Sequence, residues 1–201
     1  MSHQIEDEFI YDSNKYILSD IEFPENFIDI YSLGFKPTEF NTACWRGFIA
    51  TYSVYKKYLV LKNLYTNNGS NLKNVAPKLN NKLPKISINK DWVSEETKMN
   101  RREFTYTNIN LNIPYTGSII IVKDFIDKYI SGPYAFLNIS PCCYKKIIRL
   151  TFIDGILANT KNLSNYCKKI RTEKINTLKD ERHDSAYFGW PDINNLFKEE
   201  V

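Results

Sequence analysis

Residues 146–158 read KIIRLTFIDGILA, two apolar and β-branched runs that meet at Asp154 and Gly155. Asp-Gly between two such runs favours the two-residue turn of a β-hairpin, in which both turn residues adopt a positive φ. The stretch therefore predicts a long hairpin with its turn at Asp154 and Gly155. Because hairpins join neighbouring antiparallel strands, this signal also points to an antiparallel fold class.

Other segments of the chain repeat this pattern. Residues 48–55 alternate between two faces, and residues 58–65 continue with β-branched and aromatic side chains after Lys56 and Lys57. Residues 9–11 and 15–18 flank a polar turn, and residues 104–113 and 118–122 have the composition of strands. We therefore expect three or four hairpins.

Helices are predicted in three short stretches. Pro24 begins a helix that Gly34 ends, residues 124–130 have helical spacing before Gly132 and Pro133, and residues 163–178 form a basic amphipathic helix. The apolar stripe of the last helix is expected to pack on the sheet. The aromatic tail, residues 186–201, is expected to dock on the body of the protein, whereas residues 67–90 lack a sustained period and predict a long surface loop.

These elements predict a β-dominated α+β fold, with an antiparallel curved sheet or partial barrel built from hairpins and a few short helices. No alternation of strand and helix favours a parallel, doubly wound sheet. We expect a single domain over residues 1–201. Its parts are an acidic N-terminal segment (1–40), a hairpin-built core (41–160) that includes the loop 67–90, and a C-terminal helix with an aromatic tail (161–201).

The composition of the 201 residues is that of a globular protein, with 43% hydrophobic and 14% aromatic residues. No apolar run is long enough for a membrane span, and the first eight residues are acidic where a secretory signal would be basic. A cytoplasmic protein without membrane contact is the expectation. The four cysteines are too few and too irregular for a disulfide framework, so we interpret them as reduced thiols.

The net charge of +4 conceals a strong asymmetry along the chain. Residues 1–40 carry −7, residues 41–180 carry +14 and residues 181–201 carry −3. The basic middle could attract phosphates or an acidic partner. Alternatively, the acidic ends could fold back over the middle and neutralise it.

The sequence contains no recognisable catalytic or metal motif. The glycine-rich nucleotide patterns and the serine-hydrolase pattern do not occur, and the adjacent Cys142 and Cys143 do not match zinc spacing. The two histidines, His3 and His183, have no sequence relation to a cysteine that indicates a nucleophile pair. We therefore predict no catalytic residue, no metal and no cofactor, and we weigh against an enzyme while leaving that class open.

The segment Thr42-Ala43-Cys44-Trp45-Arg46-Gly47 is the one local oddity. Arg46 lies between a tryptophan and a run of core-type residues, so it either anchors an anion or partner beside Trp45 or forms an internal salt bridge with the acidic N-terminal region. With the strand that follows it, this segment resembles one found in uncharacterised bacterial proteins of about this size. The resemblance implies a bacterial cytosolic protein and transfers no activity.

Two readings also apply to Tyr52, Tyr55, Lys56, Lys57 and Tyr58. Aromatic and basic side chains in alternation can form a stacking platform for single-stranded nucleic acid, or they can be an ordinary exposed sheet face. Nucleic acid is a possible partner that we do not favour over a protein.

The sequence is best interpreted as a non-enzymatic protein-binding module, an immunity or accessory protein in bacterial toxin or anti-phage conflict. The candidate binding residues are Trp45, Arg46, Tyr52 and Trp190, because aromatic and arginine side chains are frequent interface anchors. The alternative is a nucleotide- or phosphate-binding sensor or enzyme, with Arg46 and nearby lysines on the phosphate and a pocket between the main sheet and the 67–90 loop. The sequence does not define an oligomeric state.

Overall fold

The computed structural model describes residues 5–68, 76–93, 100–126, 139–180 and 194–198. Within these residues the chain forms one mixed, mostly antiparallel sheet and a few short helices. The strands are β1 (Glu8–Tyr11), β2 (Asn14–Ile21), β3 (Phe48–Tyr55), β4 (Tyr58–Asn67), β5 (Lys85–Val93), β6 (Asn100–Tyr106), β7 (Leu111–Asn112), β8 (Gly117–Phe125), β9 (Tyr144–Ile153) and β10 (Ile156–Asn162). The helices are η1 (Pro24–Asn26), η3 (Pro141–Cys143), α1 (Ser164–Asp180) and α2 (Asn194–Lys198).

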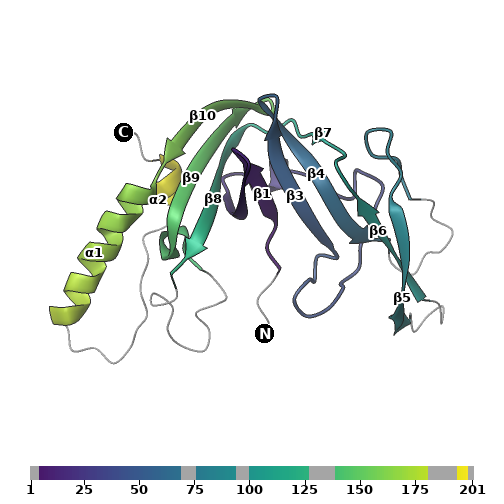
Figure 1. The fold of residues 1–201 in the computed structure, drawn as a ribbon, viewed down its shortest axis with the longest axis horizontal. Helices are drawn as coiled ribbons and strands as arrows, with labels where there is room; N and C mark the ends of the chain where they lie inside the picture. Colours follow the sequence, from purple (N-terminus) through teal and green to yellow (C-terminus); the bar gives the residue numbers. More distant parts are fainter. Residues whose placement is uncertain (1–4, 69–75, 94–99, 127–138, 181–193, 199–201) are drawn as a thin grey trace.

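The sheet curls into a ring-like partial barrel, which confirms the predicted fold class. Its strand order is β10-β9-β8-β2-β1-β3-β4-β6-β5, and a single pair, Ile156 with Tyr58, joins β10 back to β4. Figure 1 shows β8, β9 and β10 on one side and β3 and β4 on the other, meeting at the top of the view. The pairing of β1 with β3 is parallel, so the sheet is not purely antiparallel.

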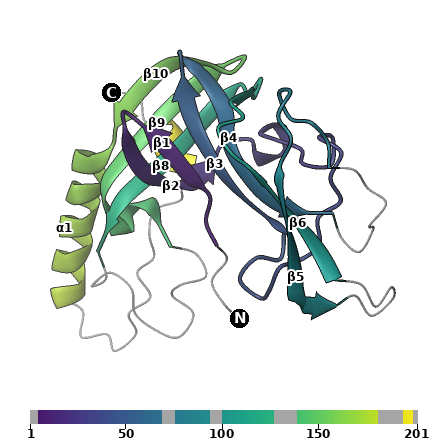
Figure 2. The same cartoon turned by 45° about the vertical axis from the view of Figure 1, so that its right-hand side comes forward.

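Strand β4 determines where the ring closes and where it opens. One edge of β4 pairs with β3 along its whole length. The other edge pairs in turn with β10 at Tyr58, with β7 at Val60 and Leu61, and with β6 from Leu64 to Asn67. Because β6 leaves β4 at the end far from β10, the β5–β6 hairpin extends away from the ring, as Figure 2 shows.

Aromatic and aliphatic side chains fill the inside of the ring. Phe27 packs edge-on against Tyr52 and Tyr115, with ring centroids 5.0 and 5.2 Å apart. Tyr52, Tyr115 and Phe152 are fully buried and come from three different strands or connections. Burial of large apolar side chains on several strands is the main force that keeps the sheet curled.

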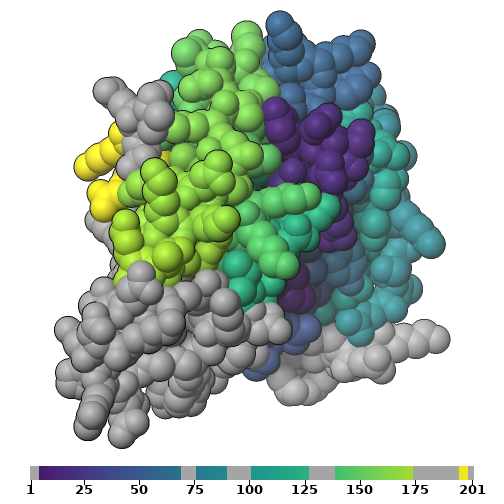
Figure 3. Space-filling model, turned by 60° about the vertical axis from the view of Figure 1, so that its left-hand side comes forward, coloured from purple at the N-terminus to yellow at the C-terminus, as the bar shows by residue number. Residues whose placement is uncertain are grey.

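A second apolar cluster lies on the outer face of β8 and β9, beneath α1. It combines Ile120 and Val122 of β8 with Leu163 and Cys167 at the start of α1, and Leu196 of α2. Figure 3 shows α1 and α2, in lime and yellow, on this side of the molecule. The prediction that the stripe of the C-terminal helix packs on the sheet is confirmed, and the described part of the tail, α2, docks there too.

Arg149 holds α2 in place. Its guanidinium group is almost fully buried and donates hydrogen bonds to the backbone oxygens of Leu196 and Phe197, at 3.0 and 2.6 Å. These are carbonyls at the C-terminal end of a helix, where a cation is favoured. The polar contact explains why an arginine occupies a buried position of β9.

Four predicted elements differ from the structure. The strand expected over residues 104–113 is interrupted between β6 and β7, where Asn108 and Asn110 have positive φ. The helix expected from Pro24 shortens to η1, because the side chain of Asp29 accepts a hydrogen bond from the Tyr31 N–H and competes with helical pairing. The loop 67–90 ends early, since β5 begins at Lys85. Residues 124 and 125 extend strand β8 instead of beginning a helix, Ile126 follows the strand without helical structure, and residues 127–130 lie outside the described residues.

Among the helices of the described residues, none combines the length and the apolar character needed to cross a bilayer.

Candidate functional site

The outer edge of β5 is the strongest candidate for a binding surface. Strand β5 pairs with β6 on one side, and no described strand pairs with its other side. Figure 1 shows β5 as the last strand at the end of the sheet opposite α1. The outer edge of a strand presents backbone N–H and C=O groups that another strand can pair with.

The side chains near this edge are apolar and exposed to an unusual degree. Ile86 is 52% exposed, Ile88 is 58% exposed and Leu83, just before the strand, is 63% exposed. Ile86 and Ile88 alternate along β5 and lie on one face, opposite Phe104 and Arg102 of β6. The edge thus combines a backbone with which no described strand pairs and a row of apolar side chains, which natural edge strands usually avoid.

The charge around the edge is basic. Lys82, Lys85 and Arg102 are exposed, and residues 82–89 contain no acidic side chain. Edge strands often carry lysine to discourage pairing with further copies of the same chain. A partner strand with acidic side chains would be attracted instead.

A buried polar cluster beneath the hairpin fixes the position of β6. The carboxylate of Glu103 accepts hydrogen bonds from the Tyr65 hydroxyl, from Asn89 Nδ2 at 2.8 Å and from Arg101. Arg101 is 2% exposed, donates to the Glu39 backbone oxygen at 2.7 Å and lies over the Phe40 ring. Burial alone would raise the pKa of Glu103, but these hydrogen bonds together lower it. The cluster therefore anchors the hairpin.

Arg46 forms the internal salt bridge that was one of its two predicted roles. Its Nη2 atom donates to Asp7 Oδ1 at 2.7 Å and to the Ile5 backbone oxygen at 3.1 Å, and its Nε atom donates to the Phe48 oxygen. Asp7 Oδ1 also accepts the Ala50 N–H at 2.7 Å. The guanidinium group thus ties the N-terminal segment to β3, and the alternative role as an anion anchor loses its support.

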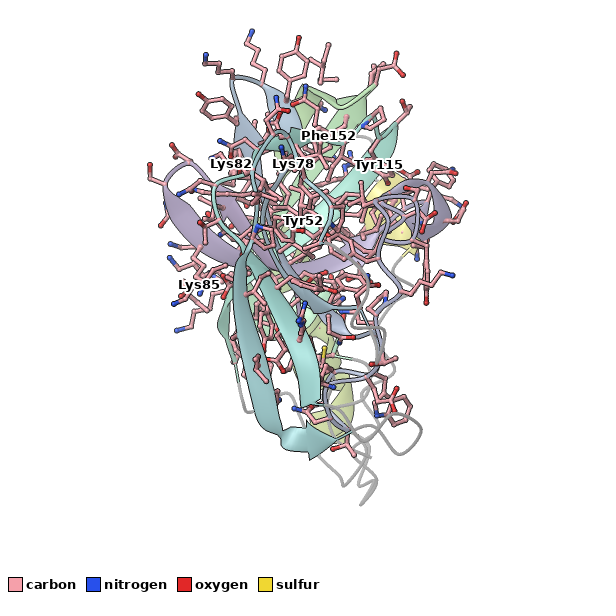
Figure 4. The ribbon with its side chains drawn as sticks, turned by 90° about the vertical axis from the view of Figure 1, so that its right-hand side faces the viewer. Tyr52, Lys78, Lys82, Lys85, Tyr115 and Phe152 are labelled. Carbon is pink, nitrogen blue, oxygen red and sulfur yellow. The ribbon has the colours of Figure 1, made fainter. Side chains whose placement is uncertain are left out.

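Of the other three predicted binding residues, the two that the structure describes, Trp45 and Tyr52, do not form one surface. Trp45 lies in the turn before β3 and is 56% exposed, as an interface residue should be. Tyr52 was expected to be exposed, and that prediction is wrong: it is 1% exposed because its face of β3 points into the ring, as Figure 4 shows. Trp190 lies outside the described residues.

The structure does contain a groove between the main sheet and the 67–90 segment, where the alternative interpretation expected a pocket. The groove measures about 410 Å³ and is lined by the tip of the β3–β4 hairpin, by Asn80 and Lys82, and by the connection from β6 to β7. Arg46 is not among its lining residues. A groove thus lies at the expected place, but the basic residues that line it are Lys56 and Lys82 and do not include Arg46.

The buried thiols form part of the second apolar cluster. Cys142 donates to the sulfur of Cys167 with the two sulfur atoms 2.7 Å apart, and burial raises the pKa of Cys143 to about 11. Within the described residues no group of three or more potential metal ligands occurs, and both histidines lie outside them.

Comparison with known proteins gives no match: no family model, no curated protein and no solved structure is significantly similar to the chain. The resemblance of the Thr42–Gly47 segment to uncharacterised bacterial proteins therefore stays a prediction.

Sequence reasoning missed the β5 edge. The signal was present as the alternation Ile86-Ser87-Ile88-Asn89, which is typical of a strand, but the asparagines, lysines and prolines before it favoured a loop. The groove was placed correctly in sequence, while its lining residues could be identified only once the fold brought 55–58, 80–82 and 108–112 together.

Proposed function

We propose that this chain is a non-enzymatic, cytoplasmic protein-binding module that captures an extended, acidic segment of a partner protein at the outer edge of β5. The single observation that carries the proposal is the exposure of Ile86 and Ile88 on a strand whose outer edge has no partner in the described residues. Strand addition gives affinity through backbone hydrogen bonds and specificity through alternate side chains.

The chemistry of the edge defines the partner strand. Apolar side chains at alternate positions would cover Ile86 and Ile88 on one face, and an acidic side chain at an intervening position would face Lys85 on the other face. A second copy of this chain would bring the same lysines together, so a different protein fits better. An immunity or accessory protein in bacterial conflict would act in this way, by covering a surface of its partner, and that role is part of the proposal.

The alternative function, a phosphate sensor built on Arg46, is less well supported. The guanidinium group already donates to Asp7, Ile5 and Phe48. A phosphate at this position would have to displace Asp7, which the backbone of Ala50 also holds.

The test is copurification from the native host with the unmodified chain and with the variant Ile86→Thr/Ile88→Thr. Threonine keeps the β-propensity of the strand and removes apolar contact, so the fold should be retained. We expect a stoichiometric protein partner with the unmodified chain and its loss with the double variant. Hydrogen exchange should then show new protection along β5 and along one extended, acidic segment of the partner.

The matched control is Ile153→Thr, because Ile153 is an equally exposed isoleucine (56%) at the far hairpin. Loss of the partner in this control, retention in the β5 variant, or a clean monomer at several salt concentrations would each contradict the proposal. If the unmodified chain instead forms a homodimer that the β5 variant does not form, the partner at this edge is a second copy of the chain, and the proposal of a different protein is wrong. The neighbouring genes would separately test the conflict role.

A further inference from the structure

The groove at the tip of the β3–β4 hairpin is lined by aromatic, basic and amide side chains that have no part in strand capture at β5. Two tyrosines, Tyr55 and Tyr58, are 48% and 44% exposed, and Lys56 lies between them in sequence with its amine 5.4 Å from the Tyr55 ring centroid. Lys82 lines the same groove and donates to the Asn108 backbone oxygen at 2.5 Å. No carboxylate lines the groove.

The two central residues of the hairpin turn adopt backbone angles that lysine disfavours. Lys56 and Lys57 occupy the two central positions between the paired residues Tyr55 and Tyr58, with φ of 49° and 73°. Such a turn strongly favours Asn-Gly, since a residue with a long side chain is strained at positive φ. Two lysines in this turn are therefore less stable than asparagine and glycine would be.

Asparagines complete the groove opposite the hairpin. Asn80, Asn108 and Asn110 all have positive φ, between 48° and 51°, and Asn80 Nδ2 donates to the Ile109 oxygen at 2.8 Å. Side-chain amides carry both a donor and an acceptor, which matches the edges of nucleic-acid bases. The groove thus offers flat aromatic faces, cations and amides within about 410 Å³.

The surrounding surface extends the positive charge beyond the groove. Lys57, Lys78 and Lys85 are exposed, and none of them forms an ion pair in the part of the chain that the structure describes. Figure 4 shows Lys78, Lys82 and Lys85 on one side of the molecule, in front of the ring that contains Tyr52 and Tyr115. A ligand that carries several phosphates would be attracted to this basic surface.

We propose that this groove binds single-stranded nucleic acid, with one base on Tyr55 or Tyr58 and the adjoining phosphates on Lys56, Lys57 and Lys82. Exposed aromatic rings beside lysines are the combination that proteins use to bind single strands without sequence preference. An acidic peptide would use the lysines but would leave the two rings without a role. The proposal is independent of strand capture at β5.

The experiment measures anisotropy of fluorescein-labelled dT12 and rU12 with the full chain between 50 and 300 mM KCl. The key variant is Lys56→Asn/Lys57→Gly, which places the preferred residues in the turn. We expect it to raise the Tm, to weaken binding about twentyfold at 0.1 M salt, and to reduce the slope of log K against log salt by about 1.4, since each phosphate contact on a single strand contributes about 0.7. Opposite effects on stability and binding cannot arise from misfolding.

Two further variants define the controls. Lys168→Gln/Lys169→Gln removes the same charge from the exposed face of α1 and should leave binding within about twofold. Tyr58→Leu should weaken binding at least fivefold because stacking is lost, while Tyr58→Phe should retain it.

Several results would overturn the proposal. These are no binding of either oligonucleotide at 50 mM KCl, equal loss in the α1 control, binding of UMP as tight as that of rU12, or competition by polyglutamate as effective as competition by unlabelled rU12. The last result would assign the groove to an acidic protein segment instead.

Discussion

Asp7 shows how one residue joins the N-terminal segment to the ring. It lies next to β1, is buried, and binds both the Arg46 guanidinium group and the Ala50 N–H. Burial raises the pKa of Asp7 to about 6, although Arg46 and the Ala50 N–H each act to lower it. The ionised carboxylate is thus held in place by two partners while burial still opposes its charge.

This raised pKa has a consequence for stability. In the folded chain Asp7 takes up a proton near pH 6, whereas in the unfolded chain it does so near pH 3.8. The folded state therefore binds more protons between these values, and the contribution of Asp7 to the free energy of unfolding increases as the pH falls. From pH 7 to pH 4.5 the increase is about 2 kcal/mol.

We expect the variant Asp7→Asn to lose this pH dependence. Asparagine has nearly the same shape and can still accept the Ala50 N–H, but it does not titrate. Urea unfolding of both proteins at pH 7.0, 6.0, 5.0 and 4.5 gives the difference in free energy of unfolding. That difference should change by about 2 kcal/mol over the range in favour of the unmodified chain at low pH. If the free energies of unfolding of the two proteins changed in parallel with pH, Asp7 would not take up a proton between pH 7.0 and pH 4.5.

At the scale of elements, the β9–β10 hairpin closes the ring. The turn residues Asp154 and Gly155 have φ of 50° and 76°, as the sequence predicted for an Asp-Gly turn. Gly155 also exchanges hydrogen bonds with two neighbouring segments: its N–H donates to the Tyr115 oxygen and its oxygen accepts the Leu59 N–H at 2.7 Å. The same glycine thus fixes the turn and joins it to β4.

Replacement of Gly155 by alanine should open this closure. A Cβ atom at Gly155 would lie 2.4 Å from the Ile113 oxygen, a backbone atom that cannot move aside. We expect Gly155→Ala to lower the free energy of unfolding by about 3 kcal/mol or more, and to speed hydrogen exchange at the Leu59 amide.

The matched comparison is Gly34→Ala, because Gly34 also has a positive φ, 91°, but its added Cβ would meet only Pro77 at 3.7 Å. Its cost should be about 1 kcal/mol from backbone strain alone. Equal destabilisation by the two variants in thermal unfolding would contradict the role of Gly155 in closure.

The elements also show what the sequence could and could not reveal. The hairpins at 9–18, 45–66 and 146–158 were predictable because their alternation and turn residues are local signals. The full length of the helix after Pro24 was not, since the backbone N–H of Tyr31 donates to the side chain of Asp29 and not to a helical carbonyl. The alternation of residues 48–55 between two faces was predicted, but only the closed ring decides that the face with Tyr52 points inward.

The binding surfaces depend on contacts that are distant in sequence. The β5 edge exists because β4 pairs with β10, β7 and β6 along one side, and no local pattern specifies such a sequence of partners. The internal role of Arg46 was one of two predicted alternatives, and the distance to Asp7, 39 residues earlier in the chain, decides between them.

At the scale of the whole molecule, β8 couples the two apolar clusters. Ile119 and Ile121 point into the ring, while Ile120 and Val122 point outward to the cluster beneath α1, and all four are fully buried. A strand that is buried on both faces cannot lose one cluster without exposing half of its side chains. The ring and the helical layer should therefore unfold as one unit.

We expect Ile121→Ala and Ile120→Ala to affect the same transition, although they remove contacts from different clusters. Each should lower the free energy of unfolding by about 2–5 kcal/mol, the usual cost of a buried isoleucine truncated to alanine. Thermal unfolding followed by helical circular dichroism at 222 nm and by near-ultraviolet tyrosine signals should give coincident curves in both variants. If Ile120→Ala instead melted the helical signal at a lower temperature than the tyrosine signal, α1 and its cluster would be a separate layer, and β8 would transmit nothing between the two sides of the sheet.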